Sequence, residues 1–221
     1  MQRFFDIIFS GIALIFLLPI FIPVIIILRF TGENEVFFFQ ERVGKEDSRI
    51  KLFKFVTMLK NSENMGSGTI TLKNDSRVLP FGKILRKTKL NELPQLINVL
   101  NGDMSIIGPR PQTQRCFNAF PTSSQKEILK VRPGLSGIGS IIFRNEEEMM
   151  EESSNPDEFY DSVIMPYKGI LECWYVKNKN IITFFIFIIL TILVILHPNN
   201  RLIWKIYPSL PKIPIDLEKY L

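Results

Sequence analysis

The chain has 221 residues, carries a formal net charge of +5 and is 46% hydrophobic. Its apolar residues are concentrated in two segments, which indicates membrane segments around one domain and not an unusually apolar globule. The basic surplus suits an anionic bilayer or a phosphate substrate, and no dense Lys/Arg run favours nucleic acid. Two cysteines and one histidine argue against a disulfide framework, a multi-histidine zinc site and histidine general-base chemistry.

The first apolar segment covers residues 7–28 and contains no charge. A helix of that length could just cross a bilayer core of ~30 Å. Pro19 and Pro23 lie inside it, and each removes a backbone donor and bends a helix. Two shapes follow: a kinked transmembrane helix, or a re-entrant hairpin that breaks near Pro19. Basic residues at both ends favour the hairpin mildly, because positive flanks prefer the cytoplasm.

Residues 36–40 and 50–59 predict two strands joined by a turn at residues 44–47. Taken alone, Lys54 in the second strand is interpreted as a solvated lysine. A polar, glycine-rich loop is expected at residues 61–68. A basic cluster follows at helical spacing and could lie on lipid head groups: Lys83, Arg86, Lys87 and Lys89.

A short amphipathic helix is predicted to start between Thr88 and Asn91 and to stop at Gly102, because its leucines fall at helical spacing and Pro94 suits only a first turn. Its N-terminal end would present Asn91 and Glu92 to an anion such as a diphosphate. Asparagine is also among the best N-cap residues, so Asn91 alone predicts a cap. Glu92 could equally complement the helix dipole.

Two arginines lie next to prolines in this half of the chain. Arg110 stands between Pro109 and Pro111, and Arg132 precedes another proline. Guanidinium groups bind phosphate oxygens in a bidentate manner, and a restricted backbone lowers the entropy lost on binding. The two arginines form a candidate diphosphate clamp, although either could be a structural ion pair.

The remaining sequence predicts a loop into a short strand at 136–143, a solvated acidic helix face at 146–152 and helix at 157–178. A metal site in the acidic run is disfavoured because consecutive carboxylates point around a helix. The apolar run 181–196 is short for a membrane span, so a membrane segment, an interfacial helix and a buried helix remain open. The proline-rich tail from Pro198 is expected to be an extended surface segment.

The central block, LRKTKLNELPQLINVLNGDMSIIGPRP, resembles the small monotopic phosphoglycosyl transferases, the bacterial sugar transferase family. The family block reads LR-x-x-S/T-L-D-E-L-P-Q-L-x-N-V-L-x-G-D-M-S-x-x-G-P-R-P. The resemblance extends over most of the chain. It includes the N-terminal apolar segment with its proline and four further blocks, at residues 40–44, 54–58, 75–82 and 131–134.

The resemblance implies transfer of a sugar 1-phosphate from a UDP-sugar to polyprenol (undecaprenyl) phosphate, with release of UMP and with Mg²⁺ as cofactor. This is the first membrane step of surface glycan assembly, such as exopolysaccharide or lipopolysaccharide, at the cytoplasmic face of the bacterial inner membrane. It implies an α+β, mostly helical fold with three parts: a re-entrant membrane helix at 1–30, a membrane-surface catalytic domain with amphipathic helices at 31–180, and an apolar helix with a tail at 181–221. Membrane lipids are further partners, nucleic acid is not, and a homodimer remains open.

The resemblance also assigns residues by position. Asn91 and Glu92 stand at the catalytic Asp-Glu pair, whose Asp attacks the β-phosphate in a ping-pong reaction. The expected phosphate-binding residues are Lys54, Arg86, Arg110, Pro111 and Arg132, and the expected metal ligands are Glu92 and Asp103.

Two positions depart from the family pattern. Val56 stands where Arg or Lys is common, and Asn91 puts a weakly nucleophilic amide where the attacking carboxylate belongs. Three explanations remain for Asn91: an engineered inactive variant, a natural non-catalytic member, or a member that uses Glu92 or direct transfer between phosphates. The alternative function is therefore a membrane scaffold that binds nucleotide-sugar or lipid.

Overall fold

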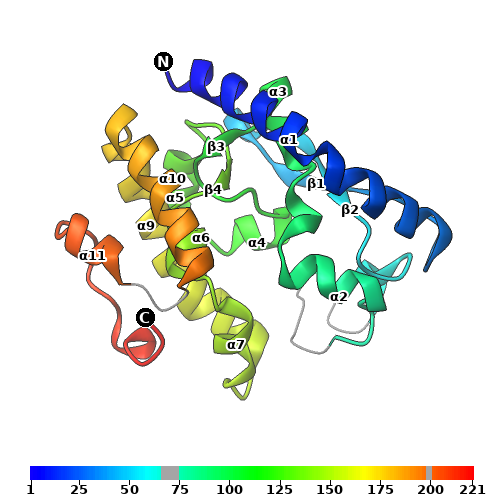
Figure 1. The fold of residues 1–221 in the computed structure, drawn as a ribbon. Helices are drawn as coiled ribbons and strands as arrows, with labels where there is room; N and C mark the ends of the chain where they lie inside the picture. Colours follow the sequence, from blue (N-terminus) through cyan, green and yellow to red (C-terminus); the bar gives the residue numbers. More distant parts are fainter. Residues whose placement is uncertain (66–74, 198–200) are drawn as a thin grey trace.

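The long N-terminal helix α1 (Gln2–Phe30) crosses one side of the molecule in the computed structural model, which describes residues 1–65, 75–197 and 201–221 (Figure 1). The helix is continuous through Pro19 and Pro23. Within the described ranges it is the one helix long and apolar enough to cross a membrane. Its buried face packs mainly on α3 (Gln95–Asn101), and many apolar side chains point outward. Whether α1 spans or re-enters a bilayer stays a prediction.

The two predicted strands are confirmed as an antiparallel pair, β1 (Phe37–Val43) and β2 (Arg49–Phe55). Phe37 pairs with Phe55 at one end and Val43 with Arg49 at the other. The turn between them, Lys45–Asp47, has positive φ at both Glu46 and Asp47. The second strand is shorter than expected, because the chain leaves the ladder after Phe55 and forms an isolated bridge from Met58 to Val78.

The central helix begins later than the sequence predicts. Helix α2 (Pro80–Lys87) is followed by a 3₁₀ turn, Leu90–Glu92, and α3 starts at Gln95 with Pro94 as its N-cap. The prediction of a start between Thr88 and Asn91 was therefore wrong. Lys89 has φ +58, and this left-handed residue redirects the chain before the 3₁₀ turn. The predicted stop is confirmed, with Gly102 in the left-handed region at φ +96.

A second small sheet joins β3 (Ser105–Ile107) and β4 (Gly134–Ser136) in parallel. The strands approach so closely that a Cβ on Gly134 would lie 2.1 Å from the backbone nitrogen of Gly108. The strand expected within 136–143 is wrong, because helix α6 (Ile138–Ile142) occupies most of that run. The isoleucines of α6 are buried and fall at helical spacing. In so short an apolar run, the periodicity of the sequence does not distinguish a strand from a helix.

The remaining regular elements of the described chain are helices, and the prediction of helix at 157–178 is confirmed. A π-helical turn at Tyr160–Ile164 precedes the long helix α9. Helix α10 is half-buried and packs against α6 and β3 (Figure 1). The fold is thus α+β and mostly helical, as expected. The elements are α4 (Gln114–Asn118), α5 (Thr122–Ile128), α7 (Glu146–Glu151), α8 (Pro156–Phe159), α9 (Met165–Asn178), α10 (Ile181–Leu196) and α11 (Leu202–Ile206).

The C-terminal tail differs from its prediction. Pro198 and residues 66–68 of the expected loop lie outside the described residues. From residue 201 onward the tail forms α11 and a 3₁₀ turn, Ile215–Leu217, and does not remain an extended surface segment. Ile203, Leu210 and Leu217 are buried in the main hydrophobic core. The tail packs against the core through these apolar side chains, because removing them from water is favourable.

Candidate active site

A cavity of about 1230 Å³ lies between the β1–β2 pair, the central block and α10. One part of its lining is charged and comes from the two strands, α2 and the segment after β3. Another part is apolar and comes from α10, including Ile188, Ile192 and Ile195. The predicted site residues on the lining are Lys54, Arg86, Asn91, Glu92 and Arg110. The cavity therefore joins a charged region with an apolar wall.

Glu92 is the centre of the charged region. Arg110 Nη2 donates to Glu92 Oε1 at 2.5 Å, and Lys54 Nζ lies 3.9 Å from the same oxygen. All three side chains are largely buried, with exposed fractions of 17% for Glu92, 15% for Lys54 and 32% for Arg110. The isolated interpretation of Lys54 as a solvated lysine was wrong, because its strand faces the cavity and not bulk water.

Charge and burial compete in this cluster. Burial alone would raise the pKa of Glu92, but Arg110 and Lys54 outweigh it and hold that pKa well below its usual range. The Glu92 charge in turn raises the pKa of Arg110. For Lys54, burial and the neighbouring Arg42 lower the pKa to about 7, because together with Arg110 and Arg86 they outweigh the attraction of Glu92. Glu92 is thus ionised at neutral pH, while Lys54 titrates there.

Arg42 is a cavity residue that no sequence motif assigned to the site. Gln40 and Arg42 alternate with outward residues of β1 and both line the cavity. Arg42 Nη2 donates to Gln40 Oε1 at 2.5 Å, and burial followed by the charge of Arg110 lowers the Arg42 pKa. Its Nε is buried without a hydrogen-bond partner among the described atoms. The available signal was the period of two along β1, which places both side chains on one face.

Asn91 lies inside the 3₁₀ turn and is 93% buried, with 7% of its surface exposed. Its prediction as a helix N-cap was wrong: Lys89 caps the turn, Pro94 caps α3, and neither helix start has a side-chain cap bond. Asn91 Oδ1 has no hydrogen-bond partner among the described residues. A buried amide oxygen without a partner costs about 1–3 kcal/mol, so Asn91 carries an unsatisfied acceptor just behind the wall of the cavity.

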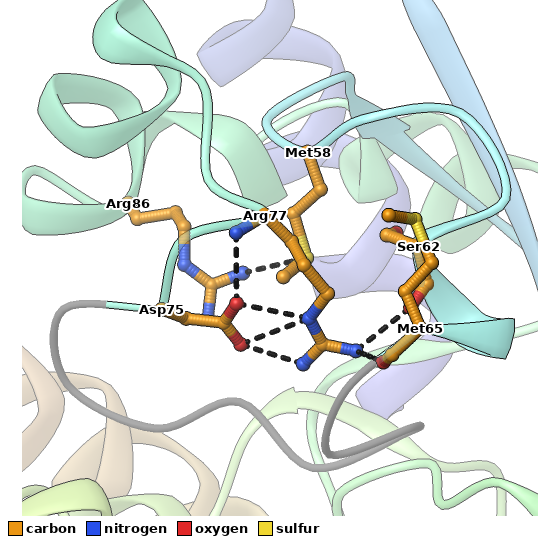
Figure 2. Close-up of polar contacts among 6 residues, drawn as sticks. All are labelled: Met58, Ser62, Met65, Asp75, Arg77 and Arg86. Carbon is orange, nitrogen blue, oxygen red and sulfur yellow. Dashed lines mark hydrogen bonds and ion pairs between the residues drawn. The ribbon is translucent and has the colours of Figure 1, made fainter.

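Arg86 reaches the cavity beside a buried ion pair, shown in Figure 2. Asp75 Oδ2 and Arg77 Nη2 are 2.5 Å apart, and Arg77 Nη1 also donates to the carbonyls of Ser62 and Met65 at 2.7 and 2.8 Å. Arg86 Nη1 lies 4.0 Å from the sulfur of Met58. The Asp75–Arg77 pair thus fixes the backbone next to Arg86.

The structure places the other predicted site residues elsewhere. Pro111 is buried behind Arg110, Arg132 faces a second, smaller cavity, and Asp103 does not line the large cavity. Asp103 Oδ2 accepts from Asn98 Nδ2 at 3.2 Å. Arg132 Nε donates to the carbonyl of Gly102 at 2.7 Å. The candidate phosphate clamp of Arg110 and Arg132 is therefore not assembled around one cavity.

The fit of Mg²⁺ depends on what the cavity offers. The described ranges contain no group of three His, Cys, Asp or Glu side chains that could hold a metal on their own. Mg²⁺ is commonly held by one or two carboxylates together with substrate phosphates. The Glu92 carboxylate lines the cavity and is one such donor, whereas Asn91 Oδ1 is buried away from the cavity space. A single carboxylate fits a metal whose other ligands arrive with a diphosphate.

Comparison with known proteins identifies the class. The bacterial sugar transferase family model matches residues 1–198, so the chain belongs to that family. The exopolysaccharide production protein ExoY of Sinorhizobium fredii is 33% identical over 159 residues, covering 66% of this chain and 70% of that protein. The exopolysaccharide production protein PSS of Rhizobium leguminosarum bv. phaseoli is 41% identical over 148 residues, covering 64% and 73%.

Longer relatives are also similar. The UDP-glucose:undecaprenyl-phosphate glucose-1-phosphate transferase of Klebsiella pneumoniae is 36% identical over 163 residues. That match covers 72% of this chain and 34% of the relative. The chain thus corresponds to about a third of the longer protein.

Proposed function

We propose that this chain transfers a sugar 1-phosphate from a UDP-sugar to undecaprenyl phosphate and releases UMP, at the cytoplasmic face of the inner membrane. Family membership and the names of the relatives support the reaction class. The single observation that carries it here is the cluster of Arg110, Lys54 and Glu92 in a cavity with an apolar wall. Such a cavity suits a diphosphate at its charged part and a polyprenol chain along α10.

The charged side chains have separate tasks in this proposal. Arg110, Arg86 and Lys54 would bind the phosphate oxygens, because fixed cations stabilise charge that builds up on phosphorus. Glu92 would hold Mg²⁺ together with the substrate phosphates. When bound, the metal supplies further neutralisation of the phosphates. The P–O bond to UMP breaks, and the β-phosphorus forms a bond to an oxygen of the polyprenol phosphate.

Asn91 determines which route that transfer takes. An amide does not replace a carboxylate nucleophile, so a covalent route through residue 91 is closed to this chain. Glu92 is ionised and borders the cavity, which supports it as an alternative nucleophile; direct attack by the polyprenol phosphate is the other route. A non-catalytic binder of the same ligands is the second candidate function, and it rests on Asn91 alone.

The test uses the full chain in lipid with radiolabelled UDP-sugars, undecaprenyl phosphate and Mg²⁺. Labelled lipid product from the parent chain, abolished by Glu92→Gln, supports transfer through Glu92 or its metal. An inactive parent that gains turnover as Asn91→Asp identifies residue 91 as the lesion in a transferase. Failure of both the parent and Asn91→Asp, with UDP-sugar still bound, would contradict the enzyme proposal in favour of the binder.

A further inference from the structure

A second cavity, of about 200 Å³, lies beside the start of α1. Strand β3 lies between it and the large cavity: Ser105 lines the small cavity, Ile106 lines the large one, and Ile107 borders both. The lining comes from α1, the β1–β2 turn, the segment before β4 and the α9–α10 junction. These segments are distant in sequence and converge here.

The small cavity is strongly basic. Among the described residues that line it, one is acidic, Asp6. Asp6 Oδ1 accepts from Ser105 Oγ and from the Ile106 backbone nitrogen, both at 2.9 Å. The basic residues on the lining are Arg3, Lys45, Lys130, Arg132 and Lys179.

Two of these cations are fixed in place by backbone carbonyls, and the Asp6 carboxylate offsets part of their charge. Arg3 donates to the carbonyls of Val99 and Leu100, and Arg132 donates to the carbonyl of Gly102. Carbonyl oxygens at the end of α3 carry only partial charge, so both guanidinium groups keep most of their field. Capping of α3 explains these two arginines.

Capping does not explain the lysines, which do not contact α3 in any hydrogen bond among the described residues. Lys45 and Lys130 are exposed and pair with Glu46 and Glu127, and ion pairs of exposed lysines contribute little. Partial burial and the charge of Lys45 lower the pKa of Lys179. Like charges that gather around one cavity indicate a site for an anion.

The surroundings of the cavity indicate where the anion comes from. The apolar helices α1 and α10 both begin next to the cavity. They are in contact there, because the rings of Phe5 and Phe185 meet edge to face with their centroids 5.0 Å apart. Phe4, Ile7 and Ile182 are exposed on the same turns, with 62%, 46% and 68% of their surface accessible. Basic groups bordered by exposed apolar side chains match the headgroup zone of a bilayer.

We infer that this small cavity binds the phosphate headgroup of an anionic membrane lipid, whose acyl chains lie over the exposed apolar side chains of α1 and α10. The inference rests on the membrane attachment proposed above, but not on the transfer reaction. It would make the cavity a positioning site that fixes the depth of the protein at the bilayer surface, separate from the cavity that holds Glu92.

The test measures binding of dihexanoyl phosphatidylglycerol to the full chain in neutral detergent, with dihexanoyl phosphatidylcholine and inorganic phosphate as comparison ligands. The test variant is Lys45→Gln/Lys179→Gln. The matched control, Lys126→Gln/Lys212→Gln, removes the same charge from exposed positions off the cavity. Because each of the two lysines near an anionic lipid contributes about 1 kcal/mol, we expect the test variant to bind phosphatidylglycerol about 30-fold more weakly.

The control variant is expected to bind within about twofold of the parent, and phosphatidylcholine much more weakly than phosphatidylglycerol. Equal weakening in the test and control variants, or no weakening in either, would overturn the site. Inorganic phosphate that competes at concentrations similar to phosphatidylglycerol would show a free-anion site and overturn the lipid assignment. The test variant should bind UDP-sugar as tightly as the parent does. A failure of the lipid-site proposal can therefore be told apart from a failure of the transfer proposal.

Discussion

Arg110 and Glu92 are 18 residues apart in the chain and meet at 2.5 Å, between Nη2 and Oε1. The backbone of Arg110 is restricted by prolines on both sides, and Glu92 lies in a 3₁₀ turn before α3. Each partner shifts the pKa of the other toward its charged form. The pair therefore joins the two ends of the central block and keeps a charged carboxylate in the cavity.

Breaking this pair should cost more than breaking a surface pair. Arg110→Met leaves the Glu92 carboxylate mostly buried with Lys54 as its remaining close cation, and we expect a loss of about 2 kcal/mol in the free energy of unfolding. In a double-mutant cycle with Glu92→Gln, the coupling should be about 1–2 kcal/mol. The exposed pair Arg115–Asp161, at 3.0 Å, is the control and should give under about 1 kcal/mol. Equal coupling in both cycles would contradict the role assigned to Arg110.

Ligand binding should depend on pH through Lys54. Its pKa is lowered to about 7, so the ammonium is present below that pH and is progressively lost above it. Because a diphosphate favours the charged form, UDP affinity should fall as the pH rises from 6 to 8.5, and binding near pH 7.5 should take up protons. Calorimetry in buffers of different ionisation enthalpy measures that uptake.

The matched variant for this prediction is Lys54→Arg, which stays charged across the range. Its UDP affinity should change less with pH than that of the parent. The same pH slope in both proteins would assign the dependence to another group.

Gly82 should not tolerate a side chain. A Cβ at this position in α2 would lie 2.2 Å from the carbonyl oxygen of Thr57, which is backbone and cannot move aside alone. We expect Gly82→Ala to destabilise the protein by about 1–3 kcal/mol, as overpacked sites do. Gly11→Ala is the control, because its Cβ would meet only Leu100 Cδ1 at 3.7 Å. Denaturant unfolding of both variants in the same detergent makes the comparison, and equal stability would contradict the close approach.

The sequence predicted the parts of the fold whose patterns are local. The two strands and the stop at Gly102 depend on neighbouring residues, and both predictions are confirmed. The start of α3 and the helix at Ile138–Ile142 were wrong because tertiary contacts decided them. The pairing of Lys54 and Arg110 with Glu92 depends on three segments meeting, which no periodicity encodes. The resemblance located these residues in the sequence, whereas their geometry required the structure.

Glu172 is a buried acid in α9 that the sequence did not single out. It is 1% exposed, Oε2 has no hydrogen-bond partner among the described residues, and burial raises the pKa to about 7 against the opposing charge of Lys168. Lys168 itself is paired with Glu146 at 2.7 Å. A folded-state pKa above the unfolded value of 4.5 means that the native state holds an extra proton between these values.

The free energy of unfolding should therefore fall by up to about 3 kcal/mol as the pH rises from about 4.5 to about 7. Above that pH it should level off. Glu172→Gln keeps the shape and removes the titration, so it should be more stable than the parent at pH 8 and lose that advantage at pH 5. Glu218→Gln, at an exposed position, is the control and should track the parent at both pH values. Urea unfolding of the three proteins at pH 5 and pH 8 gives six free energies, and an advantage that does not change with pH would contradict a protonated Glu172.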